Sequence, residues 1–411
     1  MRSTKFFTFL SLIVIASLGV SACGTNAGGT SGWPGFAAND SLAFVAAGSH
    51  VYAVDIQAGK QAWTFPTIPE GGPSGPLAFL SPSTPVANQS VTSFFADPGV
   101  SDDLLLVGAE RPLNAYSGVL FGLDPTTGKP YWCLAFDPKG VAPEANAPGS
   151  TACQLVSNPV SASDNRIIGG LTLADNNAYF GLANGWIYAL EVTTESVTVK
   201  WTAQAEHAIW DAPRVDEETV YVSSLDHKLY AFDRETGSVK WKQDLSAAVV
   251  GTPALEDGTL YLGSFGNKMY ALDAQTGDEK WSAAAHDWVW GGPVLQDGLL
   301  YFTDLAGTVF AVDAETGSQK WAVTPGKVIR GSPAVIPDTV FVGDKGGTLF
   351  ALNPADGAIR WQQPISKGEI LATPVVVNNL VLVTPHLGDN LLVAYETSTG
   401  ALKWAFAPSK K

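Results

Sequence analysis

Residue types that could do chemistry are few and scattered in this 411-residue sequence. Three of its five histidines, His50, His227 and His386, stand far apart along the chain. The sequence has no Gly-x-Ser-x-Gly nucleophile turn, no His-Glu-x-x-His zinc motif and no phosphate-binding glycine loop. Because metal ligands must converge on one ion, we expect no metal site. Without any of these motifs, we also expect no catalytic residue.

The segment that ends at the first cysteine has the features of a secretion signal. A basic start is followed by an apolar stretch over 6–19 and by Val-Ser-Ala-Cys ending at Cys23, the order of a secretory signal. Small residues directly before a cysteine resemble the bacterial lipoprotein cleavage box. The resemblance implies that 1–22 are removed, that Cys23 is lipidated and that 23–35 form a flexible tether. An ordinary signal peptide with an incidental cysteine is the alternative reading.

The other two cysteines, Cys133 and Cys153, enclose a segment rich in proline, glycine and alanine. In an oxidising compartment such a pair is read as a disulfide. Closing a loop of this length stabilises a fold by about 3 kcal/mol on the chain-entropy model. Metal binding by two cysteines alone is a poor alternative.

A repeating tryptophan indicates the structural elements that must position any functional site. Each copy ends a phrase such as YALDAQTGDEKW (270–281), and five copies are spaced by 40 residues. The eight tryptophans are Trp63, Trp132, Trp201, Trp241, Trp281, Trp321, Trp361 and Trp404. A period near 40 residues is typical of repeat proteins.

One repeat, residues 251–281, contains four short alternating strands separated by turn signals, without helical periodicity. A four-stranded sheet cannot bury two apolar faces alone, whereas sheets stacked radially bury them against each other. The sequence therefore predicts an all-β fold, an eight-bladed β-propeller of four-stranded antiparallel blades over 36–408. We expect each tryptophan on the outermost strand, wedged against the next blade. Few residues follow Trp404, so we expect the last blade to borrow a strand from the segment after Gly32.

Strand alternation sorts the loops by face. Loops between blades share a face with the loops joining second and third strands. The spacings before Trp132 and Trp201 are 69 residues each, and the excess falls near 65–90, 109–118 and 133–166. We expect all of these insertions on the inter-blade face.

The same face carries a ring of large side chains. Nine residues after successive tryptophans, just before the innermost strand, stand Trp210, Val250, Trp290, Arg330 and Ile370. We expect these side chains to point at the mouth of the central channel, beside Asp211, Asp287 and Trp288. Aromatic residues and arginine often anchor protein interfaces. Our predicted partner-binding set is Trp210, Asp211, Trp288, Trp290 and Arg330. Alternatively, these side chains only plug the channel.

The net charge of −15 argues against nucleic acid as a partner and against electrostatic docking on anionic lipid. Any membrane attachment would then come from the lipid anchor alone. The acidic surface is compatible with a basic protein partner, although it also serves solubility.

The phrase [YF]-A-[LVF]-D-x-x-T-G-x-x-x-W resembles the pyrroloquinoline-quinone-like β-propeller repeat over nearly the whole mature chain. That family has quinone-dependent alcohol and sugar dehydrogenases and a non-enzymatic branch, which includes the propeller lipoprotein of the outer-membrane β-barrel assembly machinery. The dehydrogenases are longer and clamp the quinone with a disulfide between adjacent cysteines, which this sequence lacks. The resemblance therefore implies the non-enzymatic, BamB-like branch, and with it no cofactor.

We therefore expect a monomeric, lipid-anchored, extracytoplasmic propeller that binds a protein partner at the cell envelope. The resemblance suggests outer-membrane protein assembly as the process. A quinone-dependent dehydrogenase and a polysaccharide-binding propeller are the alternatives.

Overall fold

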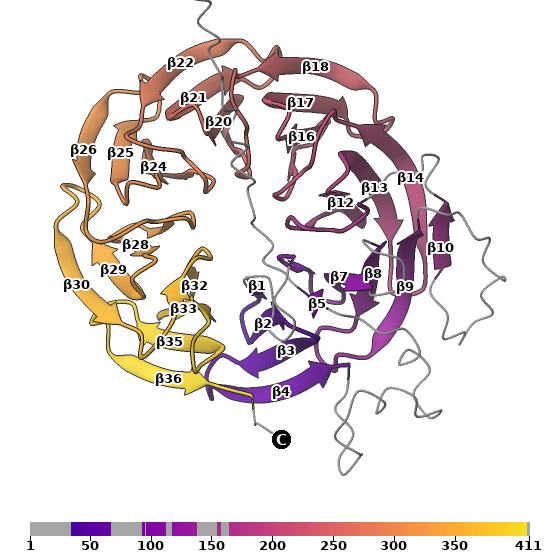
Figure 1. Cartoon of the computed structure of the whole chain (residues 1–411), viewed down its shortest axis with the longest axis horizontal. Helices are drawn as coiled ribbons and strands as arrows, with labels where there is room; N and C mark the ends of the chain where they lie inside the picture. The colour runs from indigo at the N-terminus through magenta and orange to yellow at the C-terminus, as the bar shows by residue number, and fades with distance from the viewer. Residues whose placement is uncertain are drawn as a thin grey trace, which may run out of the picture.

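The computed structural model is a closed ring of eight β-sheets around a central channel (Figure 1). It describes residues 34–66, 93–94, 96–111, 117–137, 154–157 and 164–408. The predicted all-β, eight-bladed propeller is thereby confirmed. The described residues contain no helix that is long and apolar enough to cross a membrane. We number the blades 1 to 8 in chain order.

Blades 4 to 7 are the regular ones, and in each the strands run from the channel outward in chain order. Their strands are β15 (Arg214–Val215), β16 (Thr219–Ser223), β17 (Lys228–Asp233) and β18 (Val239–Asp244); β19 (Ala254–Glu256), β20 (Thr259–Ser264), β21 (Lys268–Asp273) and β22 (Glu279–Ala284); β23 (Val294–Gln296), β24 (Leu299–Thr303), β25 (Val309–Asp313) and β26 (Gln319–Val323); β27 (Ala334–Ile336), β28 (Thr339–Gly343), β29 (Thr348–Leu352) and β30 (Ile359–Pro364).

Blades 1, 3 and 8 keep this order, and blade 8 adds a small two-stranded ladder on the loop side. Their strands are β1 (Gly35–Ala38), β2 (Leu42–Ala47), β3 (His50–Asp55) and β4 (Lys60–Phe65); β11 (Thr172–Ala174), β12 (Asn177–Gly181), β13 (Trp186–Val192) and β14 (Val197–Gln204); β31 (Glu369–Ile370), β32 (Val375–Val377), β33 (Leu380–Val383), β34 (Pro385–His386), β35 (Leu392–Glu396) and β36 (Leu402–Phe406).

Blade 2 departs from the four-stranded plan. It consists of β5 (Ser93–Phe94), β6 (Gly99–Val100), β7 (Leu105–Arg111), β8 (Ser117–Leu123), β9 (Pro130–Asp137) and β10 (Gln154–Ser157). β10 pairs in parallel with β9 at the outer edge, so the strand that carries Trp132 is not outermost here. Our expectation that the whole insertion lies on the inter-blade face is therefore wrong for 154–157, because the chain uses them to cover an open strand edge.

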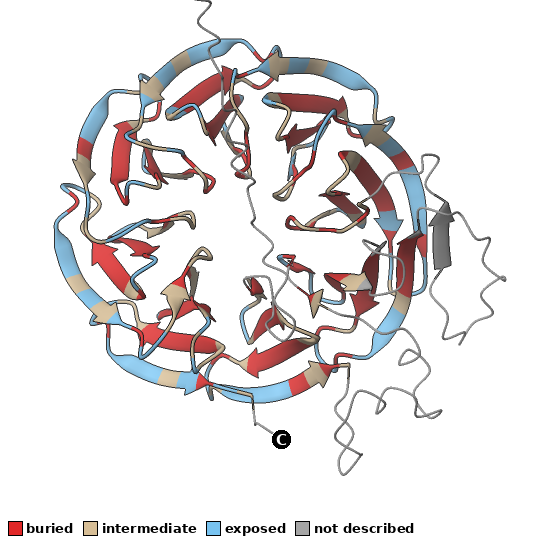
Figure 2. Cartoon of the chain, in the orientation of Figure 1, coloured by how far each residue is buried: buried red, intermediate tan, exposed pale blue. Residues whose placement is uncertain are grey.

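The core lies between blades. The second and third strands of each blade are almost fully buried, whereas the outer strands are mostly exposed, with half-buried and a few buried residues between the exposed ones (Figure 2). One cluster, for example, joins Leu229 and Ala231 of β17 to Leu260 and Leu262 of β20. Each sheet thus buries apolar side chains against its neighbours, which gives the ring a distributed core.

The repeating tryptophans lock neighbouring blades together, as predicted. The indole Nε1 of each donates a hydrogen bond to a backbone carbonyl of the next blade around the ring. The pairs are Trp63 with Pro125 (2.9 Å), Trp132 with Thr193 (2.7 Å), Trp201 with Arg234 (2.8 Å), Trp241 with Ala274 (3.1 Å), Trp281 with Ala314 (3.0 Å), Trp321 with Pro354 (2.8 Å), Trp361 with Thr397 (3.0 Å) and Trp404 with Ile56 (2.8 Å).

The turn that receives the indole is built by aspartate and glycine. In blade 6, Asp313 Oδ1 accepts the backbone N–H of Thr316, and a hydrogen bond from Lys320 is the largest of the effects that lower the pKa of Asp313. Gly317 has a φ of 71°, and a Cβ there would lie 2.7 Å from the ring of Trp281. Glycine is therefore required both for the backbone conformation and for the close approach of the indole.

The ring closes without an exchanged strand, so our expectation that blade 8 borrows one is wrong. Blade 8 has its own outer strand, β36, and blade 1 has its own inner strand, β1. Closure instead uses the usual inter-blade contact: the Trp404 indole bonds to Ile56 and its ring packs on Gly59, while Tyr52 and Phe406 meet edge to face at 6.1 Å.

Candidate interaction site at the channel mouth

Inter-blade loops and the loops between second and third strands lie against each other on one face, as the strand alternation predicts. In blade 6 the backbone N–H of Leu305 donates to the carbonyl of Trp288 at 2.9 Å. In blade 7 Lys345 makes the equivalent bond to Val328 at 2.8 Å. These paired loops surround the channel mouth.

A buried aspartate holds each pair of loops in blades 6 and 7. Asp304 accepts the backbone N–H groups of His286 (2.9 Å) and Asp287 (3.1 Å) from the inter-blade loop and that of Thr308 (3.0 Å) from its own hairpin. Asp344 occupies the same position in blade 7 and accepts the N–H of Lys327 at 2.8 Å. The loops are fixed by these bonds before any partner arrives.

Four of the five predicted partner-binding residues meet in one cluster at this mouth. The rings of Trp210 and Trp290 lie 6.0 Å apart between centroids, although they come from blades 4 and 6. The Arg330 guanidinium lies 3.8 Å from the centre of a Trp290 ring, a cation–π contact. Trp288 is connected to this cluster through Phe265. The Phe265 ring stacks on Trp288 with 4.5 Å between the ring centroids, and its centroid lies 5.0 Å from that of Trp290. We call these five residues, Trp210, Phe265, Trp288, Trp290 and Arg330, the mouth cluster.

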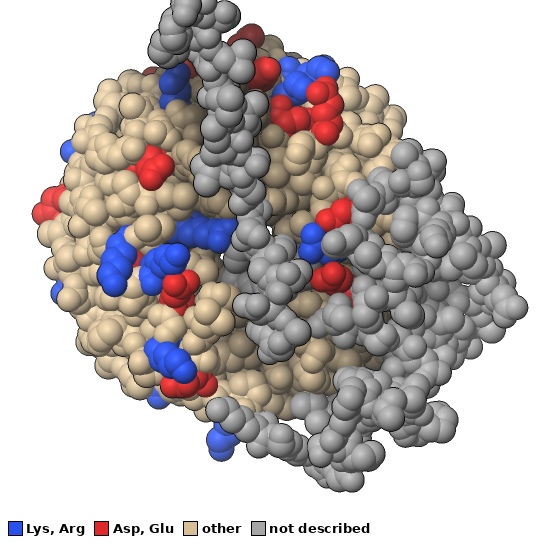
Figure 3. Space-filling view, viewed as in Figure 1, with Lys and Arg blue, Asp and Glu red and all other residues tan. Residues whose placement is uncertain are grey.

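Exposure differs within the mouth cluster. Trp288 is 42% exposed, whereas Trp210, Phe265, Trp290 and Arg330 are only partly exposed. Burial lowers the pKa of Arg330 to about 10, so its side chain stays cationic at neutral pH. On the face shown in Figure 3, basic side chains reach the edge of the central hollow, and charged side chains elsewhere are sparse.

The fifth predicted residue, Asp211, is engaged within the protein. It stands where blades 5 to 7 have Gly251, Gly291 and Gly331. Its Oδ2 accepts the backbone N–H of Thr252 in blade 5 at 3.0 Å, and its Oδ1 accepts the N–H of Ala212 at 2.8 Å. Burial raises the pKa of Asp211. Asp211 therefore ties two inner segments together at the channel wall.

The structure corrects one alignment. Ile370 is 1% exposed and sits beneath Gly343, in the way that Val289 sits beneath Gly263. It is therefore equivalent to Val289 and not to Trp290, because one additional residue precedes it in the inter-blade loop of blade 8. Val250 is also buried, at 2% exposure. Neither side chain reaches the mouth surface.

Sequence reasoning missed Phe265 and Asp97. Phe265 lies in a second-to-third-strand loop, and the face rule would have placed it at the mouth had those loops been searched. Asp97 lies in the innermost segment of blade 2 and accepts the N–H of Phe36 at 2.9 Å. Although exposed to solvent, its carboxylate is confined by the channel wall, and this desolvation, with the nearby charge of Asp211, raises its pKa to about 7.

Several predicted residues cannot be placed. Cys23, Cys153 and most of the two insertions lie outside the described residues. Cys133 lies in β9 opposite Phe121. Within the described ranges, no group of three or more histidine, cysteine, aspartate or glutamate side chains is arranged to bind a metal ion.

Comparison with known structures supports the fold. BamB from Moraxella catarrhalis superimposes with a TM-score of 0.63 at 17% identity, covering 85% of this chain and 92% of that one. A computationally designed protein, Ika8, superimposes with a TM-score of 0.64 at 12% identity, covering 92% of this chain and 96% of the designed one. A sequence comparison with curated proteins found no match.

A family model described as outer membrane protein assembly factor BamB matches residues 34–243, 183–288 and 305–410. These segments cover nearly all of the propeller, and the stretch 289–304, which contains Trp290, β23 and β24, lies between two of them. The chain therefore belongs to the BamB family of pyrroloquinoline-quinone-like β-propellers.

Proposed function

We propose that this chain is a non-catalytic scaffold, anchored to an envelope membrane by a lipid on Cys23, that holds a protein partner on its inter-blade face. The family's description as an outer-membrane protein assembly factor supports a role in that process. The observation that carries the proposal is the mouth cluster. Residues from four different blades converge on one spot, and its outermost member, Trp288, remains exposed.

Rigid aromatic residues with an adjacent arginine favour protein recognition, because they bury a large area at a small cost in side-chain entropy. The backbone bonds to Asp304 and Asp344 support the same reading, since a preorganised loop loses less freedom on binding. The rival reading, a plug that touches no partner, accounts for the packing of Trp210 against Trp290. It leaves the exposed face of Trp288 without a role.

The test is partner capture from solubilised native membranes. We expect the double variant Trp290→Ala plus Arg330→Ala, and separately Trp288→Ala, to lower recovery of the partner by about tenfold or more. The matched control is Ile359→Ala, which truncates an apolar side chain that is 48% exposed on the outer strand β30. Wild-type recovery with both mouth variants would mean that the wrong face was chosen.

Two assays separate the alternatives. Quinone that co-elutes with the pure protein in the presence of Ca²⁺ would favour a dehydrogenase-like function. Retention on a glycan column that is lost with Trp288→Ala would favour a polysaccharide-binding propeller. Neither result is expected from a protein-binding scaffold.

The anchor and the disulfide have tests of their own. Cys23→Ala should release the protein from the membrane fraction. For the Cys133–Cys153 disulfide, the register of β10 is supportive: Gln154, which follows Cys153, pairs with Leu134, which follows Cys133. Peptide mapping without reduction should recover the two cysteines in one linked fragment.

A further inference from the structure

Comparison of equivalent positions in the repeat reveals a row of apolar side chains at the channel mouth that is specific to blades 5 to 7. The inter-blade position occupied by Ala208 in blade 4 and Ala248 in blade 5 becomes Trp288 in blade 6 and Val328 in blade 7. Trp288 is 42% and Val328 37% exposed. Of the six other large hydrophobic residues that are exposed among the described residues, four lie on the outermost strands of their blades, Tyr131 lies on β9 and Leu387 lies in the loop after β34.

Neighbouring loops join these side chains into a continuous row. Phe265 of blade 5 stacks on Trp288 of blade 6, and Leu305 bonds to the backbone of Trp288. Leu305 is the counterpart of Phe265 one blade further on, as Val328 is of Trp288, so the two pairs occupy equivalent positions in successive blades. We call Phe265, Trp288, Leu305 and Val328 the apolar ridge.

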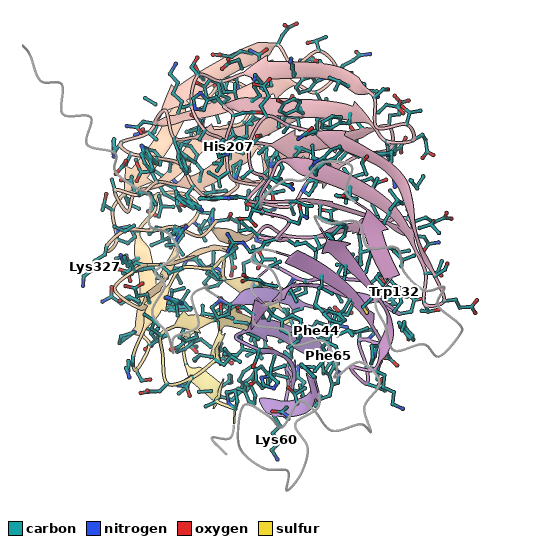
Figure 4. The ribbon with its side chains drawn as sticks, turned by 45° about the vertical axis from the view of Figure 1, so that its right-hand side comes forward. Phe44, Lys60, Phe65, Trp132, His207 and Lys327 are labelled. Atoms are coloured by element: carbon teal, nitrogen blue, oxygen red, sulfur yellow. The ribbon has the colours of Figure 1, made fainter. Side chains whose placement is uncertain are left out.

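Two lysines stand at the blade 7 end of the apolar ridge. Lys327 directly precedes Val328, and Lys345 donates its backbone N–H to the Val328 carbonyl. Both side chains are exposed, and among the residues that the structure describes neither forms an ion pair. The Lys327 stem crosses Gly346, since a Cβ there would lie 3.0 Å from Lys327 Cδ. Lys327 projects away from the ribbon in Figure 4.

Two carboxylates in the loops of blades 7 and 8 are already engaged within the protein. Asp344 is 2% exposed, and its oxygens accept the backbone N–H groups of Lys327 and Thr348 at 2.8 Å each. In blade 8, Lys367 is paired with Asp389 at 3.3 Å. The end of the ridge is thus a basic spot on a protein whose net charge is −15.

We propose that the apolar ridge binds an acidic segment of a partner protein, with an apolar side chain of that segment packed on Trp288 and Val328 and its carboxylates facing Lys327 and Lys345. This inference rests on the proposed function and names the chemistry of the partner. Charge complementarity selects the occupant, because two unpaired lysines beside exposed apolar side chains attract a segment that is both acidic and apolar. The overall negative charge disfavours long polyanions, so the site suits a short acidic stretch.

The experiment measures binding of a fluorescent, glutamate-rich synthetic peptide containing two phenylalanines to the mature propeller. Lys327→Glu plus Lys345→Glu should weaken binding by about tenfold or more, and Trp288→Ala by a similar factor. The matched control is Lys60→Glu plus Lys242→Glu, which makes the same change in net charge on the outer strands β4 and β18 and should change affinity by less than about twofold. Peptides with serine for phenylalanine, or lysine for glutamate, should bind weakly.

Three results would overturn the inference: no binding of the peptide to the wild type, equal weakening by the control pair, or binding to anionic phosphatidylglycerol vesicles in place of the peptide. Partner capture separates its failure from that of the proposed function. If Trp288→Ala abolishes capture but the double lysine variant retains it, the scaffold function stands and the acidic chemistry is wrong. If both variants retain full capture, both proposals are wrong.

Discussion

The tryptophans of this protein fall into two regions that use the same side chain for different ends. At the outer edge of the ring, which we call the rim, each repeat tryptophan donates its Nε1 hydrogen to the next blade. Its ring packs on a turn of that blade, in most blades on the glycine of the turn. At the mouth, Trp210, Trp288 and Trp290 contact rings and Arg330, and within the described residues none of their Nε1 groups donates to the protein. A satisfied indole holds a fold together, whereas an indole with an open face and an unused donor is available for a partner.

The largest effect should come from a rim tryptophan. Trp281→Ala removes a ring that packs on Gly317 and leaves the Ala314 carbonyl without its donor. We expect a loss of about 3–5 kcal/mol in the free energy of unfolding, measured by urea denaturation. Trp281→Phe keeps an aromatic ring and should lose less. A Trp281→Ala variant as stable as the wild type would remove the distinction between rim and mouth.

The glycine beneath the indole should show the next largest effect. Gly317→Ala places a methyl group against Trp281 at a φ of 71° and should cost about 2 kcal/mol or more. Gly298 is the control, since its φ is 75° but a Cβ there meets nothing within 4 Å. Gly298→Ala should therefore cost only the backbone penalty, about 1 kcal/mol. Equal costs in thermal or urea unfolding would show that the indole contact adds nothing.

Repeat logic could predict the rim but only part of the mouth. The spacing of Trp241, Trp281 and Trp321 fixed the fold, the turn and the inter-blade wedge, because a structural repeat imposes the same contacts in every blade. The mouth depends on differences between copies. The strand alternation placed Trp290 and Arg330 on one face, yet it could not reveal that Phe265 would bridge Trp288 and Trp290.

Two misplacements have the same physical origin, a local departure from the period. One residue added before Ile370 moved it from the mouth position into the core. The insertion after β9 supplied β10, which covers an open strand edge because unpaired backbone groups at that edge gain from pairing. Counting from a tryptophan identifies neither event, since both depend on packing around the inserted residues.

Charges at the mouth should respond to pH in a way that rim charges do not. The pKa of Asp97 is raised to about 7, above an unfolded value near 4. The folded state then binds more protons than the unfolded state between about pH 4 and 7, so the contribution of Asp97 to stability is lost as pH rises through this window. Asp97→Asn keeps the oxygen that accepts the Phe36 N–H and removes this loss.

The melting temperature of Asp97→Asn relative to wild type should therefore increase from pH 4 to 7 and level off above it. At the rim, hydrogen bonds from Lys320 and Thr316 lower the pKa of Asp313, so the melting temperature of Asp313→Asn relative to wild type should fall as pH rises through the acid range up to about 4 and stay constant above it. A pH-independent difference for Asp97→Asn would mean that its carboxylate is solvated as in water.

The smallest effect on stability should accompany the largest effect on binding. Trp288→Ala removes a side chain that is 42% exposed. We expect its free energy of unfolding, measured by urea denaturation, to differ from that of the wild type by less than about 1 kcal/mol. A larger loss would place Trp288 with the rim tryptophans, as a residue that holds the fold.

Photo-crosslinking in native membranes tests the division between rim and mouth most directly. A photoreactive phenylalanine analogue is introduced at Trp288 in one variant and at Ile359 in the other, since both side chains are exposed but lie in different regions. We predict that position 288 yields a covalent adduct with a partner protein and that position 359 yields none. An adduct at 359 with none at 288 would contradict our assignment of the inter-blade face as the docking surface.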